Sequence, residues 1–203
     1  MVFRAFRVVA AAALVLAAVP AAAQQFSDSY EFLEGVRKAD GTKVNKYLSD
    51  KSLRIVNTKD RNTGEGALHI VAKQRNSVYL GVFLAQPDVN PNLQDRAGNT
   101  PLLVAVDAGW SEGVTKLLAK GANVNLANSA GETPLIRAVL GHNEQLVRQL
   151  LDAGANPDKA DYQGGYSARD YAKRETRFPA IAKLVDAAPK GGAKAGGTTG
   201  PKL

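Results

Sequence analysis

The sequence predicts an all-α fold, a solenoid of about five helix-turn-helix repeats connected by loops that end in β-turn fingers. Three observations predict it. The segments DRAGNTPL (95–102) and NSAGETPL (128–135) carry the same motif 33 residues apart. Each is followed at the same spacing by Val-x-x-Leu-Leu, and then by Gly-Ala-Asn, starting at Gly121 and Gly154. A fixed period of this length is the signature of stacked helical repeats, which bury a continuous core between neighbours.

The N-terminus has the features of a signal peptide. Arg4 and Arg7 precede an uncharged run of 16 residues that ends in three alanines. This run is shorter than the roughly 20 residues of a membrane-spanning helix. We therefore expect a signal peptide over residues 1–23, cleaved near Ala23/Gln24, with no membrane insertion afterwards. The alanine-rich style suggests a Gram-negative bacterium, so the predicted location is the periplasm, or the protein is secreted.

The first repeat, approximately 27–59, has no Thr-Pro-Leu motif. It is predicted to be a cap of two helices, whose apolar positions are Tyr30, Phe32, Leu33 and Val36, then Val44, Tyr47 and Leu48. A repeat array needs such ends, because an uncapped repeat leaves an apolar face in water.

The second repeat, approximately 60–94, is degenerate. The segment GEGALH (64–69) replaces the motif, and the distance from Leu68 to Leu102 is one residue longer than the period. We expect the extra residue in 85–89, as a bulged turn without the usual C-cap glycine.

The third and fourth repeats, approximately 95–127 and 128–160, carry the motif whole. Thr100 and Thr133 stand where a helix N-cap oxygen is needed, and each is followed by a proline at the first helical position, where a missing N–H costs nothing. The glycine before each motif threonine is expected to allow a tight turn, and the glycine after each Leu-Leu pair is expected to end the outer helix.

The fifth repeat, approximately 161–188, is predicted to close the array. Ile181, Leu184 and Val185 supply its last apolar face. The remaining residues, 189–203, are rich in glycine and lysine, so we expect a disordered tail.

Taken together, residues 27–188 resemble the ankyrin repeat family, on the Gly-x-Thr-Pro-Leu, Val-x-x-Leu-Leu and Gly-Ala-Asn segments. The resemblance implies a non-catalytic protein–protein interaction module that binds no cofactor. In this family the ligand lies against the loop tips and the exposed, concave side of the inner helices. Mapped onto this chain, the implied partner-binding residues are Arg61, Asn62, Glu65, Lys73, Gln74, Arg96, Asn99, Asp107, Trp110, Ser129, Glu132, Leu140, Tyr162, Gln163, Lys173 and Arg174.

Trp110 has two interpretations within that set. It either packs on its neighbours or stands exposed as an anchor for the partner. Arg96, Tyr162 and Leu140 are the most suggestive of the others, since arginine and tyrosine are enriched among interface hot spots.

Signals for catalysis or metal binding are weak. The chain has two histidines and no cysteine, and no nucleophile elbow or phosphate-binding glycine loop occurs. His69 falls where the family carries a histidine that bonds within its repeat, and His142 falls in a turn between helices. The concave side offers a set of acids that could in principle do acid–base work: Asp95, Asp107, Glu112 and Glu132. The preferred interpretation is that they order turns and complement helix dipoles.

Composition argues against nucleic acid as a partner. The formal net charge of +7 falls to +5 without the two arginines of the signal peptide, and to +2 without the tail lysines Lys190, Lys194 and Lys202. A high isoelectric point carried by the ends of the chain is no footprint for nucleic acid. We expect a monomer that binds another protein. The alternative is an inhibitory or protective accessory subunit of a neighbouring periplasmic enzyme.

Overall fold

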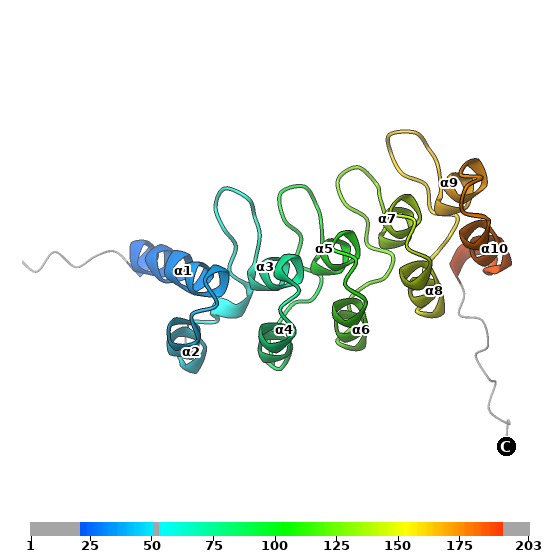
Figure 1. The fold of residues 1–203 in the computed structure, drawn as a ribbon. Helices are drawn as coiled ribbons and strands as arrows, with labels where there is room; N and C mark the ends of the chain where they lie inside the picture. The colour runs from blue at the N-terminus through cyan, green and yellow to red at the C-terminus, as the bar shows by residue number, and fades with distance from the viewer. Residues whose placement is uncertain (1–20, 51–52, 193–203) are drawn as a thin grey trace, which may run out of the picture.

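The computed structural model describes residues 21–50 and 53–192. Within these residues the chain forms ten α-helices in a single row of hairpins (Figure 1). The inner helices are α1 (Ala21–Arg37), α3 (Ala67–Gln74), α5 (Pro101–Asp107), α7 (Pro134–Leu140) and α9 (Ala168–Arg174). The outer helices are α2 (Gly41–Ser49), α4 (Ser77–Leu84), α6 (Ser111–Ala119), α8 (Glu144–Asp152) and α10 (Pro179–Ala187). Two short 3-10 helices complete the set, η1 (Ile55–Asn57) and η2 (Lys190–Gly192).

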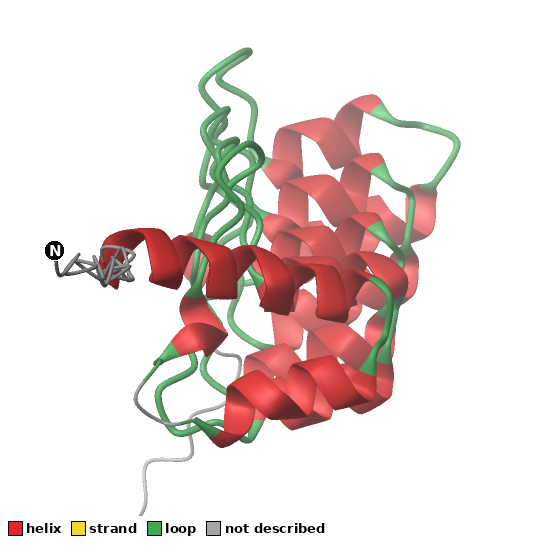
Figure 2. Ribbon diagram, turned by 90° about the vertical axis from the view of Figure 1, so that its left-hand side faces the viewer, coloured by secondary structure: helices red, strands yellow, loops and turns green. Residues whose placement is uncertain are grey.

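The predicted all-α solenoid is confirmed. Each inner helix packs against the next inner helix, and each also packs against the outer helix of its own hairpin. Four loops project from the side of the inner helices, and in the view along the array they gather in one column beside the helices (Figure 2). We call these loops fingers 1 to 4; their tips lie near residues 61–64, 96–98, 129–131 and 162–165. In the described residues only isolated bridges occur, Lys59 with Gly66 and Ala160 with Ser167.

The Thr-Pro pairs begin α5 and α7 as predicted. The Thr100 hydroxyl accepts a hydrogen bond from the Leu103 N–H at 3.2 Å, and the Thr133 hydroxyl accepts one from the Ile136 N–H at 3.2 Å. Both threonines are buried, so their side chains would otherwise leave polar groups unsatisfied. The motif is therefore a scaffold element.

The finger glycines are needed for two reasons. Gly98 and Gly131 have φ angles of 78° and 82°, a region that other residues rarely adopt. In addition, a Cβ on Gly131 would stand 2.6 Å from the backbone nitrogen of Tyr162 in the next finger. That close approach lets Tyr162 N–H donate to the Ala130 carbonyl at 2.8 Å, so consecutive fingers are joined by main-chain hydrogen bonds.

The outer helices α4 and α6 end in different ways. After α6, Gly121 has a φ of 88° and donates to the Leu118 carbonyl, while Ala122 donates to Leu117, which is the Schellman arrangement. After α4 the C-cap is Ala85 in a right-handed conformation, and Gln86 donates to Phe83 instead. The predicted turn without a C-cap glycine is confirmed.

The core is a continuous band of apolar side chains that runs through all five hairpins. One expected core residue was wrong: Tyr30 is 60% exposed, whereas Phe32, Leu33 and Val36 are buried. Tyr30 lies roughly a third of a turn away from the centre of that stripe on the helix surface, because successive residues are about 100° apart. The first cap therefore buries a narrower stripe than its sequence suggests.

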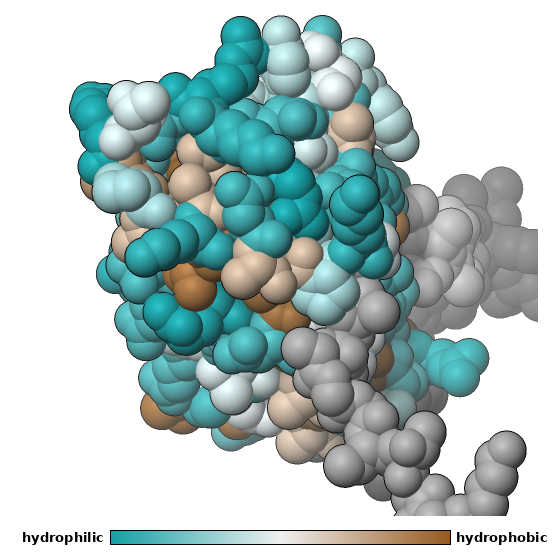
Figure 3. Space-filling model, turned by 90° about the vertical axis from the view of Figure 1, so that its right-hand side faces the viewer, coloured by the Kyte–Doolittle hydropathy of each residue, from teal (hydrophilic) through white to brown (hydrophobic). Residues whose placement is uncertain are grey.

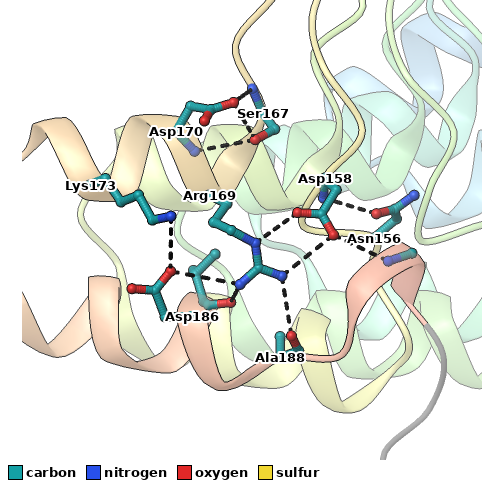
Figure 4. A network of polar contacts seen from close by, with 10 residues as sticks. Asn156, Asp158, Ser167, Arg169, Asp170, Lys173, Asp186 and Ala188 are labelled. Atoms are coloured by element: carbon teal, nitrogen blue, oxygen red, sulfur yellow. Dashed lines mark hydrogen bonds and ion pairs between the residues drawn. The ribbon is translucent and has the colours of Figure 1, made fainter.

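The last hairpin is closed by Arg169 (Figure 4). Its guanidinium donates to Asp158 at 2.7 Å, to the Val185 carbonyl at 2.5 Å and to the Ala188 carbonyl at 3.1 Å. The arginine thus satisfies carbonyls at the end of α10, where an outer helix would otherwise use a glycine turn. Beyond this network, the C-terminal end face is mostly hydrophilic, with only small apolar patches, as Figure 3 shows. A face of this kind suits the end of an array.

Two predictions lie largely outside the described residues. These are the signal peptide, of which the structure describes only 21–23, and the tail 189–203, of which it describes only 189–192. The expectation of disorder was wrong for the start of the tail, because Lys190–Gly192 form η2 and the Gly191 N–H donates to Asp158 at 3.2 Å. Helix α1 begins at Ala21, so the expected cleavage point falls in its first turn. None of the helices in 21–50 and 53–192 is long and apolar enough to cross a membrane.

Candidate functional site

The candidate site is the surface formed by the finger tips and the exposed sides of the inner helices, here called the inner face. Of the sixteen expected contact residues twelve are exposed, three are half-buried and one is buried. The half-buried ones are Glu65, Asn99 and Glu132. The exposed ones are Arg61, Asn62, Lys73, Gln74, Arg96, Asp107, Ser129, Leu140, Tyr162, Gln163, Lys173 and Arg174.

Trp110 is the buried residue, with 8% of its surface exposed, which removes it from the expected contact set. Its indole ring lies over Gly113 so closely that a Cβ on that glycine would come within 2.1 Å of the ring. Trp110 is also the N-cap of α6 and has no side-chain capping bond, unlike Asn76 and Asn143 in the neighbouring repeats. Of the two interpretations of Trp110, the packed one holds.

Each finger is shaped by one polar side chain at its base. The Asp60 carboxylate accepts the N–H groups of Asn62 and Thr63 at 2.8 and 3.0 Å, and it also takes a bond of 2.6 Å from Arg37. The Thr63 N–H and Arg37 together hold the pKa of Asp60 at about 2, below its ordinary value of 3.8. Asp95 serves finger 2 in the same way, because it accepts the Asn99 N–H at 2.8 Å. The expected turn-ordering role of Asp95 is confirmed.

Asn99 is engaged inside the array at both ends of its amide. Its nitrogen donates to Asp95 at 3.2 Å, and its side-chain oxygen accepts from the Asn128 amide at 3.2 Å. Its carbonyl oxygen lies 2.9 Å from Nε2 of His69. These hydrogen bonds connect finger 2 to finger 3 and to α3, so Asn99 contributes mainly to the shape of the inner face.

His69 plays the structural role expected for it. Its Nδ1 accepts the Gly66 N–H at 3.1 Å, which requires Nδ1 to carry no proton, and Nε2 then donates to Asn99. The side chain is fully buried, and this burial lowers the pKa of the imidazole. The neutral ring therefore binds the N–H of Gly66, the N-cap residue of α3, and connects α3 to finger 2. His142 adopts the left-handed turn expected of it, with a φ of 52°.

One position in each inner helix recurs along the inner face, and we call these five residues the inner row. In chain order they are Arg37, Lys73, Asp107, Leu140 and Arg174. Arg37 pairs with Asp60 at 2.6 Å, and Lys73 approaches Glu65 at 3.6 Å. The row therefore changes from basic, through acidic and apolar, to basic again.

The middle of the inner row is held by Arg137 of α7. Its guanidinium forms a double hydrogen bond with the Asp107 carboxylate, at 3.0 and 2.9 Å, and lies 3.4 Å from Glu132. Two of the acids considered for acid–base work thus lie beside one cation. Asp107, Arg137 and Leu140 also line a depression of about 340 Å³ between the α5 and α7 hairpins. Arg137 was not among the expected contact residues, although it follows Glu132 by five residues across the start of α7.

The last repeat carries an aromatic group on the inner face. The Tyr166 ring lies edge-on to Tyr171, with ring centres 5.6 Å apart, and the Arg174 guanidinium stands 4.2 Å from the centre of the Tyr166 ring. Tyr171 donates to Asp161 at 2.5 Å, which raises the pKa of its hydroxyl to about 12. Of these residues only Arg174 was expected at the site.

No group of three or more histidine or acidic side chains in the described part of the chain is placed to hold a metal ion. The acids of the inner face bond to backbone N–H groups or to cations, as at Asp60, Asp95 and Asp107. The face therefore offers hydrogen-bonding and apolar groups.

Comparison with known protein families identifies these repeats. A family model described as "Ankyrin repeats (3 copies)" matches the chain in two overlapping stretches, residues 38–128 and 68–161. Together they run from the end of α1 to the base of finger 4. A search of curated proteins found no significant match.

Proposed function

Since the chain belongs to the ankyrin repeat family, whose repeats are generally protein–protein interaction modules, we propose that it is a non-catalytic adaptor that binds another protein through the inner face. The family is typically non-catalytic, in keeping with this role. We further propose that the protein acts as a monomer in the periplasm or outside the cell.

The observation that carries the proposal is the regular alignment of consecutive finger tips. Main-chain hydrogen bonds join consecutive tips, from Arg96 N–H to Thr63, from Ser129 N–H to Ala97 and from Tyr162 N–H to Ala130. The side chains at these tips are set in one row by a rigid backbone, which lowers the entropy cost of binding. They include Arg96 and Tyr162, which is 73% exposed.

A pull-down tests the surface. The tagged wild type and an Arg96→Ala, Tyr162→Ala double variant are incubated with the same periplasmic extract, and the recovered proteins are compared by quantitative mass spectrometry. We expect a protein that the wild type recovers in at least tenfold excess over the variant. A matched control is Arg148→Ala, because Arg148 lies on outer helix α8 and is exposed. Identical partners at identical recovery would contradict the proposed surface.

The identity of the recovered protein separates adaptor from accessory subunit. If it is a single enzyme whose activity changes on binding, the accessory-subunit alternative replaces the adaptor proposal. Recovery of a non-enzymatic protein, or of several unrelated ones, supports the adaptor.

Export is tested separately. The basic start and alanine-rich run of residues 1–23 support the proposal that the protein is secreted through a cleaved signal peptide. Intact-mass measurement on protein recovered from the periplasmic or extracellular fraction is expected to give a chain that begins at or near Gln24. A cytoplasmic protein that retains residues 1–23 would refute this part of the proposal.

A further inference from the structure

The inner row differs in charge balance between its beginning and its end. Arg37 and Lys73 each face a carboxylate of finger 1, and Asp107 faces Arg137. Arg174 closes the row, and among the described residues no carboxylate pairs with it. Its inner-face contact is the ring of Tyr166. The array thus neutralises its own charges along the first three positions and leaves a cation unneutralised at the last.

The position of Arg174 over the Tyr166 ring leaves its guanidinium available to a carboxylate. The attraction between a guanidinium and the face of an aromatic ring does not occupy the N–H donors, and among the described residues no hydrogen bond occupies them. The ring also restricts the side chain, so less rotamer freedom is lost when a ligand binds. Arginine and a carboxylate form paired, charge-assisted hydrogen bonds, the strong class in proteins.

The nearby cations do not share this property. Arg177 forms a double hydrogen bond with Glu175, at 2.9 Å for each arm, and this pair holds the pKa of Glu175 at about 2. Lys173 lies 3.8 Å from Asp186 on the end face. Arg174 is therefore the cation of this region that is both unpaired among the described residues and directed along the inner face.

Apolar surface adjoins Arg174. Leu140 holds the preceding position of the inner row and is 42% exposed, and α7 packs directly against α9. Tyr166 is 37% exposed and Tyr171 is half-buried beside it. A ligand at this end of the inner face therefore meets one aliphatic side chain, two aromatic rings and one cation.

We propose that this end of the inner face, formed by Leu140, Tyr166, Tyr171 and Arg174, binds an acidic segment of the partner protein. An aspartate or glutamate side chain of the partner pairs with Arg174, and an apolar residue adjacent to it packs on Leu140 and the tyrosine rings. This inference rests on the proposed binding function and specifies the chemistry of the partner.

Selection from a random peptide library tests the chemistry without knowledge of the partner. Linear 12-residue peptides fused to a phage coat protein have no free C-terminus, so their carboxylates belong to side chains. The library is selected on immobilised full-length wild type, on Arg174→Gln and on the control Arg177→Gln. Both variants lose one positive charge within three residues of each other, and both side chains are on the surface. Thermal unfolding checks that all three proteins are folded.

We expect wild type and Arg177→Gln to enrich the same peptides, with an acidic residue adjacent to an apolar one. The synthetic, C-terminally amidated peptides should bind Arg174→Gln about tenfold more weakly, as the loss of a charged hydrogen bond implies. A wild-type selection without acidic enrichment, an empty selection, or equal affinity for Arg174→Gln would overturn the inference.

The pull-down separates this inference from the proposed function. If Arg96→Ala, Tyr162→Ala loses a partner that Arg174→Gln retains in full, the adaptor function stands and the acidic-segment inference fails. If neither variant changes recovery, both fail.

Discussion

The third and fourth repeats and the last repeat solve the same structural problems with different residues. In the two motif repeats a buried threonine caps the inner helix, and a glycine turn ends the outer helix. In the last repeat Ser167 and Asp170 form a reciprocal capping box, and Arg169 satisfies the carbonyls of α10. Each repeat needs a cap for its inner helix and partners for the last carbonyls of its outer helix. The residues that supply them differ at the end of the array.

This difference has a functional side. Inside the array each repeat has neighbours on both sides, so a surface charge such as Arg137 finds carboxylates on the adjacent hairpin and finger. In the part of the chain that the structure describes, the last repeat has a neighbour on one side only, and the Arg174 guanidinium lies over a ring of its own repeat instead. An end repeat can therefore present charge that a central repeat neutralises.

The largest expected difference between the centre and the ends of the array is the loss of stability when a buried leucine is truncated. Leu135 of α7 is fully buried between α5 and α9, while Leu33 of α1 is almost fully buried at the start of the array. We expect Leu135→Ala to cost about 4 kcal/mol and Leu33→Ala about 2 to 3 kcal/mol, because a central site has packed neighbours on both sides. Urea unfolding followed by circular dichroism measures both.

The shape of the transition sharpens this test. Leu33→Ala is expected to broaden unfolding, because a terminal repeat can open before the rest. Equal losses of stability with equally steep transitions would show that the ends and the centre unfold as one unit.

A glycine pair gives the next largest contrast. Gly131 and Gly165 both have positive φ angles, of 82° and 67°, but a Cβ on Gly165 would meet nothing within 4 Å. Gly165→Ala should therefore cost about 1 kcal/mol, from backbone strain alone. Gly131→Ala should cost about 3 kcal/mol, since it also forces finger 4 away from finger 3. If thermal unfolding gave the two variants the same stability, the close packing of the fingers would contribute nothing.

The closing arginine is a test of intermediate size. Arg169→Gln should lower the free energy of unfolding by about 2 kcal/mol, because it removes charged hydrogen bonds from a side chain that is only 14% exposed. The matched control is Arg148→Gln on α8, whose side chain is 58% exposed and pairs with Glu144. That surface pair should matter by less than about 0.5 kcal/mol. Chemical unfolding of both variants decides whether Arg169 acts as the end cap.

The smallest expected effect is a pH dependence at finger 1. Asp60 has a folded pKa of about 2, below its ordinary 3.8, so the unfolded chain takes up its proton first as the pH falls. The stabilisation by its charge is complete above about pH 4 and is lost as the pH falls through 2. Asp60→Asn should therefore be less stable than wild type at pH 6, and the difference should narrow at pH 2. Thermal midpoints across that range measure it, and a difference independent of pH would rule out the ionised carboxylate as its source.

Much of the scaffold was predictable because it depends on residues close together in the chain. A threonine caps the N–H three residues ahead, as Thr100 does for Leu103, and a glycine before it sets a turn of fixed shape. The hydrogen bond of His69 within its own repeat was expected from the family resemblance, and its partner Gly66 is three residues away. Tyr30 was not, because its place on the helix relative to the next hairpin decides its burial.

The surface was predictable in position but not in chemistry. Counting from the motif correctly places Leu140, Tyr162 and Arg174 in exposed positions. It does not show that Arg137 clamps Asp107 across two repeats, or that Arg174 reaches back to the ring of Tyr166. Long side chains have many rotamers, and the one adopted depends on what the neighbouring repeat presents.

By itself, the sequence determined the all-α repeat architecture, the helix starts and the finger turns, because caps, prolines and positive-φ glycines act over three or four residues. Only the tertiary structure decided that Trp110 is buried over Gly113 and that the inner row is neutralised up to its last member. Both outcomes depend on three-dimensional packing. The indole ring of Trp110 lies against its own helix, and the ion pairs of Arg37 and Asp107 join consecutive repeats, which are about 33 residues apart in the sequence.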